Sequence, residues 1–557
     1  MKKRYIFKTA LAFAALSVMS ACSGLLDDIT SQTALDQTAA FSTPSTIEVT
    51  MAGVYDAAQS GTYAGGAVRG YPFGAAHVEQ GDNRGEDVVN TQAFYQITYQ
   101  ATYDGTTANN DFHFQNLFLL INRANIVLEG LENVQPMTGL TQANIDAYTG
   151  ECRFLRALAY HELLKHFARP YSDNPTAPHG GMPYKTVAVT SVETAETGRG
   201  DERATVAENY ASILADLDYA ESVLPITRTG GQKITRATKA AAIAIKTRVY
   251  QHMGDWAKVI TEATKLVPQS AAPFSPVAAD YGSYSLTAAS FGPFAGGNKS
   301  NTESIFSIEN DVTDNPGVNG SLPQMYNTSA SPTTGRALVA ISPIIWNKPW
   351  FNATDVRKSS TFVNINVEAP TAGGKGGYFT KKYADVVGQS DNAPVIRYAE
   401  VLLNLAEALS RQSAGAPDAK AFALFNAIRS RANAAGTDPN YDQITDFATG
   451  DALTQAILNE RRIEFLCEGL RWGDIHRLAQ DPKFNDWGGG IPVKISSGVT
   501  NLRPMYTGLE STTTTILSTA GNRYNAIPYS NYKFLWPIPT SETALNPVLA
   551  AQQNPGY

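Results

Sequence analysis

Two stretches of the chain have the pattern of helical hairpins built from small residues. The first, "ATKAAAIAIKTRVYQHMGDWAKVITEATKLV", holds an alanine-rich helix, a turn at Met253-Gly254-Asp255 and a second amphipathic helix. The second, "YAEVLLNLAEALSRQSAGAPDAKAFALFNAIRSRA", turns near Gly415 and Pro417. Alanines allow two helices to approach closely, as in tetratricopeptide-like repeats. A single hairpin of this kind cannot bury its own apolar face. The two hairpins are therefore predicted to stack, although a long stretch of sequence separates them.

Three more segments are predicted to be helices from the three- and four-residue spacing of their apolar side chains. They are "NDFHFQNLFLLINRANIVLEGL", "GECRFLRALAYHELLKHFARP", which Pro170 stops, and "TVAENYASILADLDYAESVLP", which Pro225 stops. Residues 62–109, 267–303 and 485–528 are rich in Gly, Ser or Thr and read as loops with strand-like fragments. We therefore expect a mainly α fold: tetratricopeptide-like helical hairpins in an α–α superhelix, with a loop-rich irregular subdomain containing minor β.

The N-terminus has the pattern of a lipoprotein signal. The basic "MKKRYIFK" precedes the short apolar "TALAFAALSVMS", and small residues then end in "SAC" at Cys22. This order predicts cleavage before Cys22 and attachment of a lipid to its thiol; the alternative is an ordinary secretory signal cleaved nearby. The expected organisation is a signal peptide at 1–21, an N-terminal helical part at 22–265, and a C-terminal part at 266–557 with long loops.

Composition and charge limit the partners of the chain. Hydrophobic residues make up 43% and charged residues 17%, as in ordinary folded proteins. The formal net charge is −7, which argues against nucleic acid as a partner, because phosphate binding needs a concentrated basic face. Beyond Cys22 only Cys152 and Cys467 remain. A disulfide between them is permitted in an exported protein, but two buried unpaired cysteines are the expected case.

The stretch "NERRIEFLCEGLRWGDIHRL", residues 459–478, sets three glutamates four residues apart among four arginines. If it forms one helix, Glu464, Glu468 and Arg471 share a face with Glu460. Nearby arginines lower the pKa of a carboxyl, whereas a general acid needs a raised pKa. The expected role is therefore a structural brace and not an active site. The brace consists of Glu460, Arg461, Arg462, Glu464, Glu468 and Arg471.

No motif in the sequence indicates a catalytic residue, a cofactor or a metal. The histidines of "HELLKH", His161 and His166, are five residues apart and diverge by roughly 140° around a helix, so they cannot share a metal as an i, i+4 pair does. The glycine-rich "GGKGG" at 373–377 lacks the Ser/Thr and the helix of a phosphate loop. "GGAVRG" at 65–70 lies outside any strand–helix unit.

Several of these segments together resemble the SusD/RagB family of outer-membrane lipoproteins. The segments are "NERRIEFLCEGLRWGDIHRL", "RYAEVLLNLAEAL", "ECRFLRALAYHELLKHFARP" and the terminal "LWPIPTSETALNPVLAAQQNPGY". The resemblance implies lipidation at Cys22, a helical fold with tetratricopeptide-like pairs, and a tail docked as an extended strap. It also implies a role as a hinged lid over a SusC-type TonB-dependent transporter. Ligands in such a family are mostly glycans, with peptides in a minority branch, and its members are not enzymes.

Two loops offer the flat aromatic faces and polar groups that sugar recognition needs. One is "FYQITYQATYDGTTANND", where the family often uses aromatic residues and an asparagine but where its tryptophans have no counterpart here. The other is "IIWNKPWFNATD". The candidate ligand-binding residues are Tyr95, Tyr99, Tyr103, Asn109, Arg84, Trp346, Trp350 and Phe351.

The sequence thus favours a surface lipoprotein that captures an oligo- or polysaccharide for a SusC-like transporter, held to the outer membrane by its lipid. Three alternatives stay open: capture of peptides, a glycoside hydrolase using Glu464 and Glu468, and a purely structural scaffold that binds only its transporter. The glycan itself cannot be named from the sequence.

Overall fold

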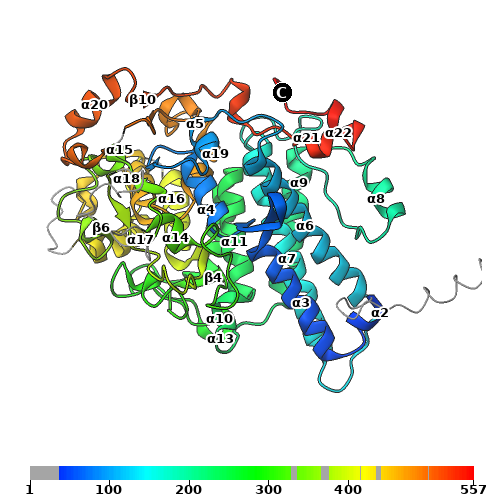
Figure 1. Ribbon diagram of the computed structural model, residues 1–557. Helices are drawn as coiled ribbons and strands as arrows, with labels where there is room; N and C mark the ends of the chain where they lie inside the picture. The colour runs from blue at the N-terminus through cyan, green and yellow to red at the C-terminus, as the bar shows by residue number, and fades with distance from the viewer. Residues whose placement is uncertain (1–36, 328–334, 365–375, 414, 434–440, 500) are drawn as a thin grey trace, which may run out of the picture.

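The computed structural model describes residues 37–327, 335–364, 376–413, 415–433, 441–499 and 501–557. Long helices fill one side of the molecule, and the other side is loop-rich (Figure 1). The helices of at least eight residues are α3 (Pro44–Gln59), α4 (Ala75–Asn83), α6 (Ala108–Leu131), α7 (Gln142–Phe167), α9 (Val206–Val223), α11 (Lys239–Met253), α12 (Trp256–Leu266), α16 (Tyr398–Gln412), α17 (Ala419–Ala432), α18 (Gly450–Glu464), α19 (Arg471–Leu478) and α20 (Glu510–Ser518). Shorter helices include α5 (Gln96–Gln100), α15 (Pro343–Trp346), α21 (Thr540–Thr543) and α22 (Pro547–Ala551).

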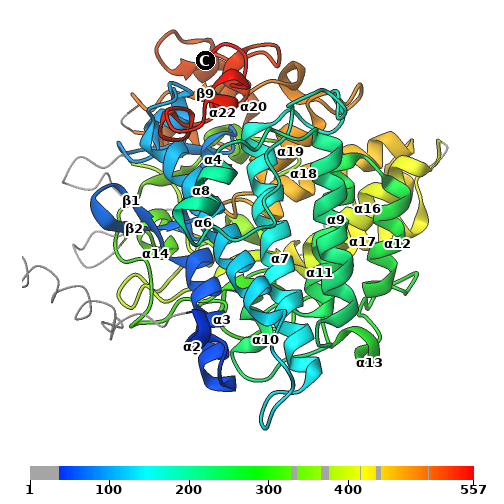
Figure 2. The same ribbon diagram turned by 90° about the vertical axis from the view of Figure 1, so that its right-hand side faces the viewer.

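The helices predicted before residue 225 are confirmed, and their ends follow local chemistry. Thr141 and Thr205 begin α7 and α9 with capping boxes that satisfy free backbone N–H groups. Helix α7 ends at Phe167, shortly before Pro170. Helices α6 and α9 both pack against α7, and Figure 2 shows the long helices lying side by side.

Both helical hairpins are present. Helices α11 and α12 are joined at Gly254, whose φ of +72° is a left-handed conformation that favours glycine. Helices α16 and α17 form the second hairpin. Helix α16 packs against both α11 and α12, so the two hairpins stack as expected across the intervening sequence. Alanines 240–242 and 244 are fully buried in α11, which is what close helix approach requires.

The rest of the described chain is irregular and holds small antiparallel sheets. The strand pairs are β1 (Gly61–Tyr63) with β2 (Ala67–Tyr71), β3 (Val88–Asn90) with β5 (Val339–Ile341), β4 (Ser304–Ile308) with β8 (Ala393–Arg397), β6 (Val363–Asn364) with β7 (Phe379–Thr380), and β9 (Lys494–Ile495) with β10 (Arg523–Tyr524). A mainly α fold with minor β is confirmed. The domain boundary at residue 265 stays a prediction, since the main apolar core holds side chains from both sides of it.

The charged stretch 459–478 is not one helix, and that expectation was wrong. Helix α18 ends at Glu464 and α19 begins at Arg471. Between them Cys467 and Gly469 adopt φ values of +66° and +78°, which end a right-handed helix. The turn lies tightly against α4, where a Cβ added to Gly81 would come within 2.0 Å of the Gly469 carbonyl oxygen. The sequence pattern carried no sign of this contact.

The glutamates of this stretch pair with cations from other segments. Glu464 lies 2.7 Å from Arg431, 2.9 Å from Arg357 and 3.0 Å from Arg397. Arg397 also reaches Glu468 at 2.8 Å. Burial acts to raise the pKa of Glu464, but the surrounding arginines overcome it and hold that pKa well below its ordinary value. The carboxylate is therefore ionised in a buried network.

The arginines of the same stretch also reach outwards to other elements. Arg461 lies 3.1 Å from Asp474, and Arg462 and Arg471 both pair with Glu86, at 2.8 and 2.6 Å. Glu86 precedes β3, so these pairs tie the C-terminal part to the N-terminal part. The stretch thus braces the fold through long-range pairs, and not through a row along one helix.

The C-terminal segment 534–557 docks on the end of α7. Trp536 is fully buried, donates its backbone N–H to the His166 carbonyl at 2.9 Å and stacks on the His166 ring. The Asn554 amide donates to the Phe167 carbonyl at 2.9 Å. The docking agrees with the expected strap, but the segment is not wholly extended: α21 and α22 lie within it, and Pro547 begins α22.

Cys22 and the predicted signal peptide lie outside the described residues. Cys152 and Cys467 are buried and unpaired, as expected. Within the described ranges, no helix combines the length and apolarity needed to cross a bilayer.

Candidate functional site

Most of the side chains predicted to bind ligand are buried. Six of the eight are between 0 and 8% exposed: Tyr95, Tyr99, Tyr103, Arg84, Trp346 and Phe351. Asn109 and Trp350 are half-buried. The expectation that all these residues present open faces in loops was therefore wrong for the six buried ones. Their role in ligand binding stays untested by the fold alone.

Arg84 shows how the buried residues are used. Its guanidinium carbon lies 3.4 Å from the Trp472 ring centroid, and its Nη1 donates to His166 Nδ1 at 3.0 Å. Burial lowers the pKa of Arg84 to about 10, with Tyr103 acting against the change. Arg84 thus joins α4, α7 and the C-terminal segment and offers no donors to a surface ligand.

Three half-buried aromatic rings form a surface beside the predicted Tyr95–Asn109 loop. Tyr63, Phe94 and Phe112 pack around the buried rings of Tyr71 and Tyr95. Tyr63 lies 4.8 Å from Phe112, measured between ring centroids, and stacks on Tyr71 at 6.1 Å. We call Tyr63, Phe94 and Phe112 the first aromatic surface. Its base is held by a separate apolar cluster, so the rings keep fixed positions while their outer faces stay accessible.

Polar groups surround the first aromatic surface. Asn109, at the start of α6, lies 3.4 Å from the Tyr63 hydroxyl. Arg69 of β2 lies 4.4 Å from the Tyr63 ring centroid and 4.8 Å from that of Phe94, and Arg336 lies 4.3 Å from Phe94. Flat rings, an amide and two guanidinium groups are the chemistry that sugar hydroxyls and ring faces need.

The sequence contained a signal for this surface that its motif reading missed. Tyr63 and Arg69 flank the glycine-rich "AGGAV" turn, which has no phosphate-binding context. Gly65 and Gly66 take φ values of +72° and +79°, so they reverse the chain and place β1 beside β2. In this hairpin the glycines form the turn, and an aromatic and a basic residue stand on either side of it. That combination is the sequence signal for an exposed loop that could contact a ligand.

A second aromatic cluster gathers the predicted Trp346 loop with two other segments. Trp346, Phe351, Tyr378 and Tyr506 lie together, and the Tyr378 and Tyr506 rings stack at 3.9 Å. Lys358 donates to the Trp346 carbonyl at 2.7 Å, and burial lowers the pKa of Lys358 to about 8. Trp350 is not part of this cluster and faces Arg462 instead. Only Tyr378 and Tyr506 keep open faces here.

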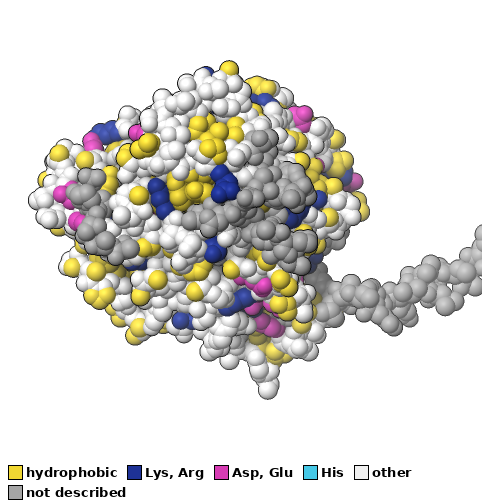
Figure 3. Space-filling model, turned by 60° about the vertical axis from the view of Figure 1, so that its left-hand side comes forward, with side chains coloured by type: hydrophobic (Ala, Val, Ile, Leu, Met, Phe, Trp, Pro, Cys, Tyr) yellow, Lys and Arg dark blue, Asp and Glu magenta, His cyan; other side chains and the backbone are white. Residues whose placement is uncertain are grey.

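The irregular side of the molecule carries surface apolar groups next to basic ones. Figure 3 views this side and shows hydrophobic side chains flanked by Lys and Arg side chains. Of the two clusters, the first aromatic surface has three half-buried rings against two, and it has an amide and two guanidinium groups beside it. It is therefore the better candidate for contact with a ligand.

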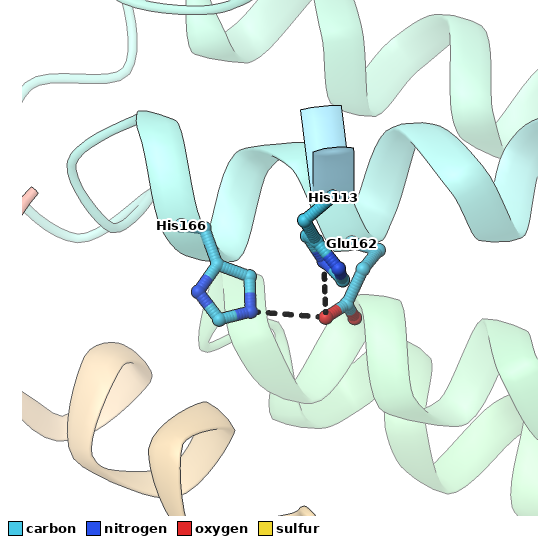
Figure 4. Close-up of side chains that lie close together, drawn as sticks. All are labelled: His113, Glu162 and His166. Carbon is cyan, nitrogen blue, oxygen red and sulfur yellow. Dashed lines mark hydrogen bonds and ion pairs between the residues drawn. The ribbon is translucent and has the colours of Figure 1, made fainter. Parts of the chain in front are cut away.

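A buried cluster of His113, Glu162 and His166 has the spacing of a metal site, and it is the one such cluster of at least three ligands found in the described residues. Figure 4 shows His113 of α6 and His166 of α7 directed at the Glu162 carboxylate. His166 Nε2 lies 3.0 Å and His113 Nε2 3.5 Å from Glu162 Oε1. Within "HELLKH" the i, i+4 pair is Glu162 and His166, and not the two histidines. The third member, His113, comes from another helix and cannot be found from local spacing.

The protons in this cluster do not fit a metal. Arg84 can only donate, so His166 Nδ1 accepts its hydrogen bond and the proton of the neutral imidazole sits on Nε2. That Nε2–H points at Glu162 and has no lone pair for a metal. The ammonium of Lys165 contacts the other oxygen of Glu162, and His77 Nδ1 lies 3.0 Å from the first. The cluster is a buried hydrogen-bond hub.

The glutamates of the hydrolase alternative do not face a ligand. Glu464 and Glu468 are 3% and 4% exposed and are bonded to arginine or lysine. A general acid needs a raised pKa and access to the leaving group. Neither condition holds for Glu464, so this pair does not support glycoside hydrolysis.

Comparisons with known proteins cover most of the chain. The family model described as "SusD family" matches residues 355–557, and the model described as "Starch-binding associating with outer membrane" matches residues 28–251. "SusD-like protein P2" of Formosa agariphila is 27% identical over 371 residues, which cover 60% of this chain and 65% of that protein, just under two thirds of its length.

Solved structures share the fold along nearly the whole chain. The crystal structure of a SusD superfamily protein from Bacteroides fragilis has a TM-score of 0.70 and 28% sequence identity, covering 91% of this chain and 99% of its own. A structure described as a laminarin-binding SusD-like protein has a TM-score of 0.61 and 21% identity, covering 92% of this chain and 98% of its own. At that identity the second likeness concerns the fold alone.

Proposed function

Because the chain belongs to the SusD/RagB family, we propose that it is a surface glycan-binding lipoprotein that passes oligo- or polysaccharide to a SusC-type TonB-dependent transporter. The family description associates its members with the outer membrane. A structural relative is described as binding laminarin, a glycan. Glu464 and Glu468, the carboxylates of the hydrolase alternative, lie buried in ion pairs, so the proposed role is binding without catalysis.

The first aromatic surface is the observation that carries this proposal. Its rings are preformed on a rigid base and stand next to an amide and two guanidinium groups. A sugar ring can place its C–H face on Phe94 or Tyr63 while its hydroxyls exchange hydrogen bonds with Asn109. A preformed site of this kind avoids the entropy cost of ordering side chains on binding.

Replacing Tyr63 and Phe94 together with alanine is expected to weaken glycan binding by about tenfold or more, because two stacking faces are lost. The measurement is affinity electrophoresis of the purified protein across a panel of glycans, with the same mixtures assayed for new reducing ends. Retardation of the wild type without cleavage is the expected result. Cleavage of a glycan by the wild type would return the chain to the hydrolase alternative.

A matched control is available on the helical side of the molecule. Tyr219 of α9 is also a half-buried ring with an arginine, Arg153, 4.1 Å from its centroid. Tyr219→Ala is expected to leave glycan retardation unchanged. Equal losses in both variants would mean that the effect is on the fold and not on the site. Binding of peptides without glycans would support the peptide alternative.

Cys22→Ala is expected to abolish incorporation of labelled palmitate and to release the protein from the outer membrane. The reason is that the lipid is proposed to be attached only to that thiol. Membrane fractionation of cells expressing either form measures this, with Cys152→Ala as the control, since Cys152 is buried. Labelling that persists in the Cys22 variant would contradict the anchor. Co-purification of the transporter with the wild type tests the proposed partner.

A further inference from the structure

Two arginines on the first aromatic surface have no carboxylate partner among the described residues, unlike the arginines of the buried ion network. Among the described residues, the Arg69 side chain makes no ion pair or hydrogen bond, and its buried Nε has no partner. Arg336 donates through Nη1 to Asn319 at 2.6 Å and has no ion pair in the same ranges. By contrast, Arg357 and Arg397 each bind two or more carboxylates. Arg69 and Arg336 therefore keep donors that no carboxylate of the described residues occupies, and both lie against the same aromatic ring.

A buried acid, Glu79, acts electrostatically on both arginines but makes no ion pair with either. Glu79 of α4 is fully buried, and neither of its carboxyl oxygens has a hydrogen-bond partner. Burial raises the pKa of Glu79 well above its ordinary value, although Arg336 and Arg69 act against the rise. The surface thus keeps excess positive charge on a chain whose formal net charge is −7.

The aromatic rings hold both guanidinium groups in place. Phe94 lies between them, with Arg69 and Arg336 at 4.8 and 4.3 Å from its ring centroid. When the face of a guanidinium group stacks on an aromatic ring, its N–H groups point sideways, parallel to that ring. They can then donate hydrogen bonds to a ligand beside the ring. The paired N–H donors of a guanidinium group match the two coplanar oxygens of a carboxylate. They also match the three terminal oxygens of a sulfate ester, which form a pyramid.

We propose that Arg69 and Arg336 bind the anionic group of an acidic sugar residue, a uronate carboxylate or a sulfate ester, while Phe94 and Tyr63 contact the sugar ring. This inference rests on the proposed glycan-binding function and names the class of its ligand. A neutral glycan would leave the two guanidinium groups with water, whereas an acidic glycan gains charge-assisted hydrogen bonds.

The test compares acidic glycans with their neutral counterparts by affinity electrophoresis. The probes are polygalacturonate beside its carboxyl-reduced form, and dextran sulfate beside dextran, within the wider glycan panel. The wild type is expected to be retarded by an acidic glycan at about one tenth or less of the concentration needed for its neutral counterpart. The preferred pair tells whether carboxylate or sulfate is the ligand group. Raising the salt concentration is expected to weaken only the acidic interaction.

The variant for this test is Arg69→Gln with Arg336→Gln, and the control is Arg123→Gln with Arg199→Gln, two exposed arginines of the helical side. The test variant is expected to lose about tenfold or more in binding the acidic glycan and nothing for a neutral one. The control is expected to behave as the wild type. A melting curve shows whether each variant is folded, and the salt dependence of the wild type needs no variant.

The possible results distinguish failure of the acidic-sugar inference from failure of the proposed glycan-binding function. Retardation of the wild type by neutral glycans alone would overturn the acidic-sugar inference and leave glycan binding standing. Acidic glycans that bind the test variant as tightly as the wild type would overturn it as well. Silence across the whole glycan panel would instead sink the proposed function.

Discussion

Replacing Glu464 with alanine is expected to lower the free energy of unfolding by about 3 to 5 kcal/mol. The carboxylate is buried and bonded to Arg357, Arg397 and Arg431, so its loss leaves three cations in an apolar interior with fewer counter-charges. Removing one partner of a buried ion pair leaves an uncompensated buried charge, which lowers stability strongly. Replacing the whole pair with apolar residues has a much smaller effect. Chemical denaturation followed by circular dichroism measures the change.

The control for this prediction lies on the same helix. Asp451, at the start of α18, pairs with Lys483 at 2.6 Å, but both side chains are more than half exposed. Asp451→Asn is expected to change the free energy of unfolding by less than about 1 kcal/mol, because exposed pairs are screened by water. Similar losses in the two variants would mean that the buried network has no special weight in stability.

Lowering the pH from 7 to 5 is expected to destabilise the fold, by about 1.4 kcal/mol per pH unit for each proton that unfolding takes up in net. Burial lowers the pKa of five histidines, which the folded protein keeps neutral and the unfolded chain protonates near pH 6.5. These are His113, His161, His166, His252 and His476. Since the unfolded state binds more protons, the stability present above pH 6.5 is lost as the pH falls.

Two buried acids oppose this trend. Burial raises the pKa of Asp82 to about 7 and that of Glu79 well above its ordinary value, so both bind protons more readily in the folded state. They reduce the net uptake of protons on unfolding, but the five histidines outnumber them, so stability still falls as the pH is lowered. Urea denaturation at a series of pH values measures this dependence. His161→Phe is expected to reduce the slope and the exposed His179→Gln to leave it unchanged; a stability independent of pH would contradict the account.

Features that depend on local sequence could be predicted. The hairpin at Gly254 and the end of α7 before Pro170 depend on φ preferences and side-chain spacing that lie within a few residues. The break between Glu464 and Arg471 could not be predicted in this way, because it depends on the close approach of Gly81 from a distant helix. Local pattern favoured a continuous helix there, and tertiary contact decided otherwise.

The ligand site was harder to predict for a related reason. Tyr95 and Phe94 are neighbours with the same aromatic character, yet Tyr95 is buried and Phe94 keeps an open face. An aromatic residue in a loop can be buried in the core or exposed at the surface. Which of the two occurs depends on the neighbouring segments that pack against it. The segment therefore stays a predicted place of ligand contact, while burial contradicts open faces for Tyr95, Tyr99 and Tyr103.

The docked C-terminal segment has a consequence for how the chain matures. Trp536, through its backbone N–H, and Asn554, through its side-chain amide, donate to the carbonyls of His166 and Phe167 at the end of α7, which lie almost 400 residues earlier in the chain. The His166 carbonyl and the face of the His166 ring on which Trp536 stacks stay uncovered until residue 536 has been synthesised. The N-terminal helices therefore expose apolar surface during translation and export, and exposed apolar surface promotes aggregation. We expect chaperones to protect these helices until the C-terminal segment has been synthesised.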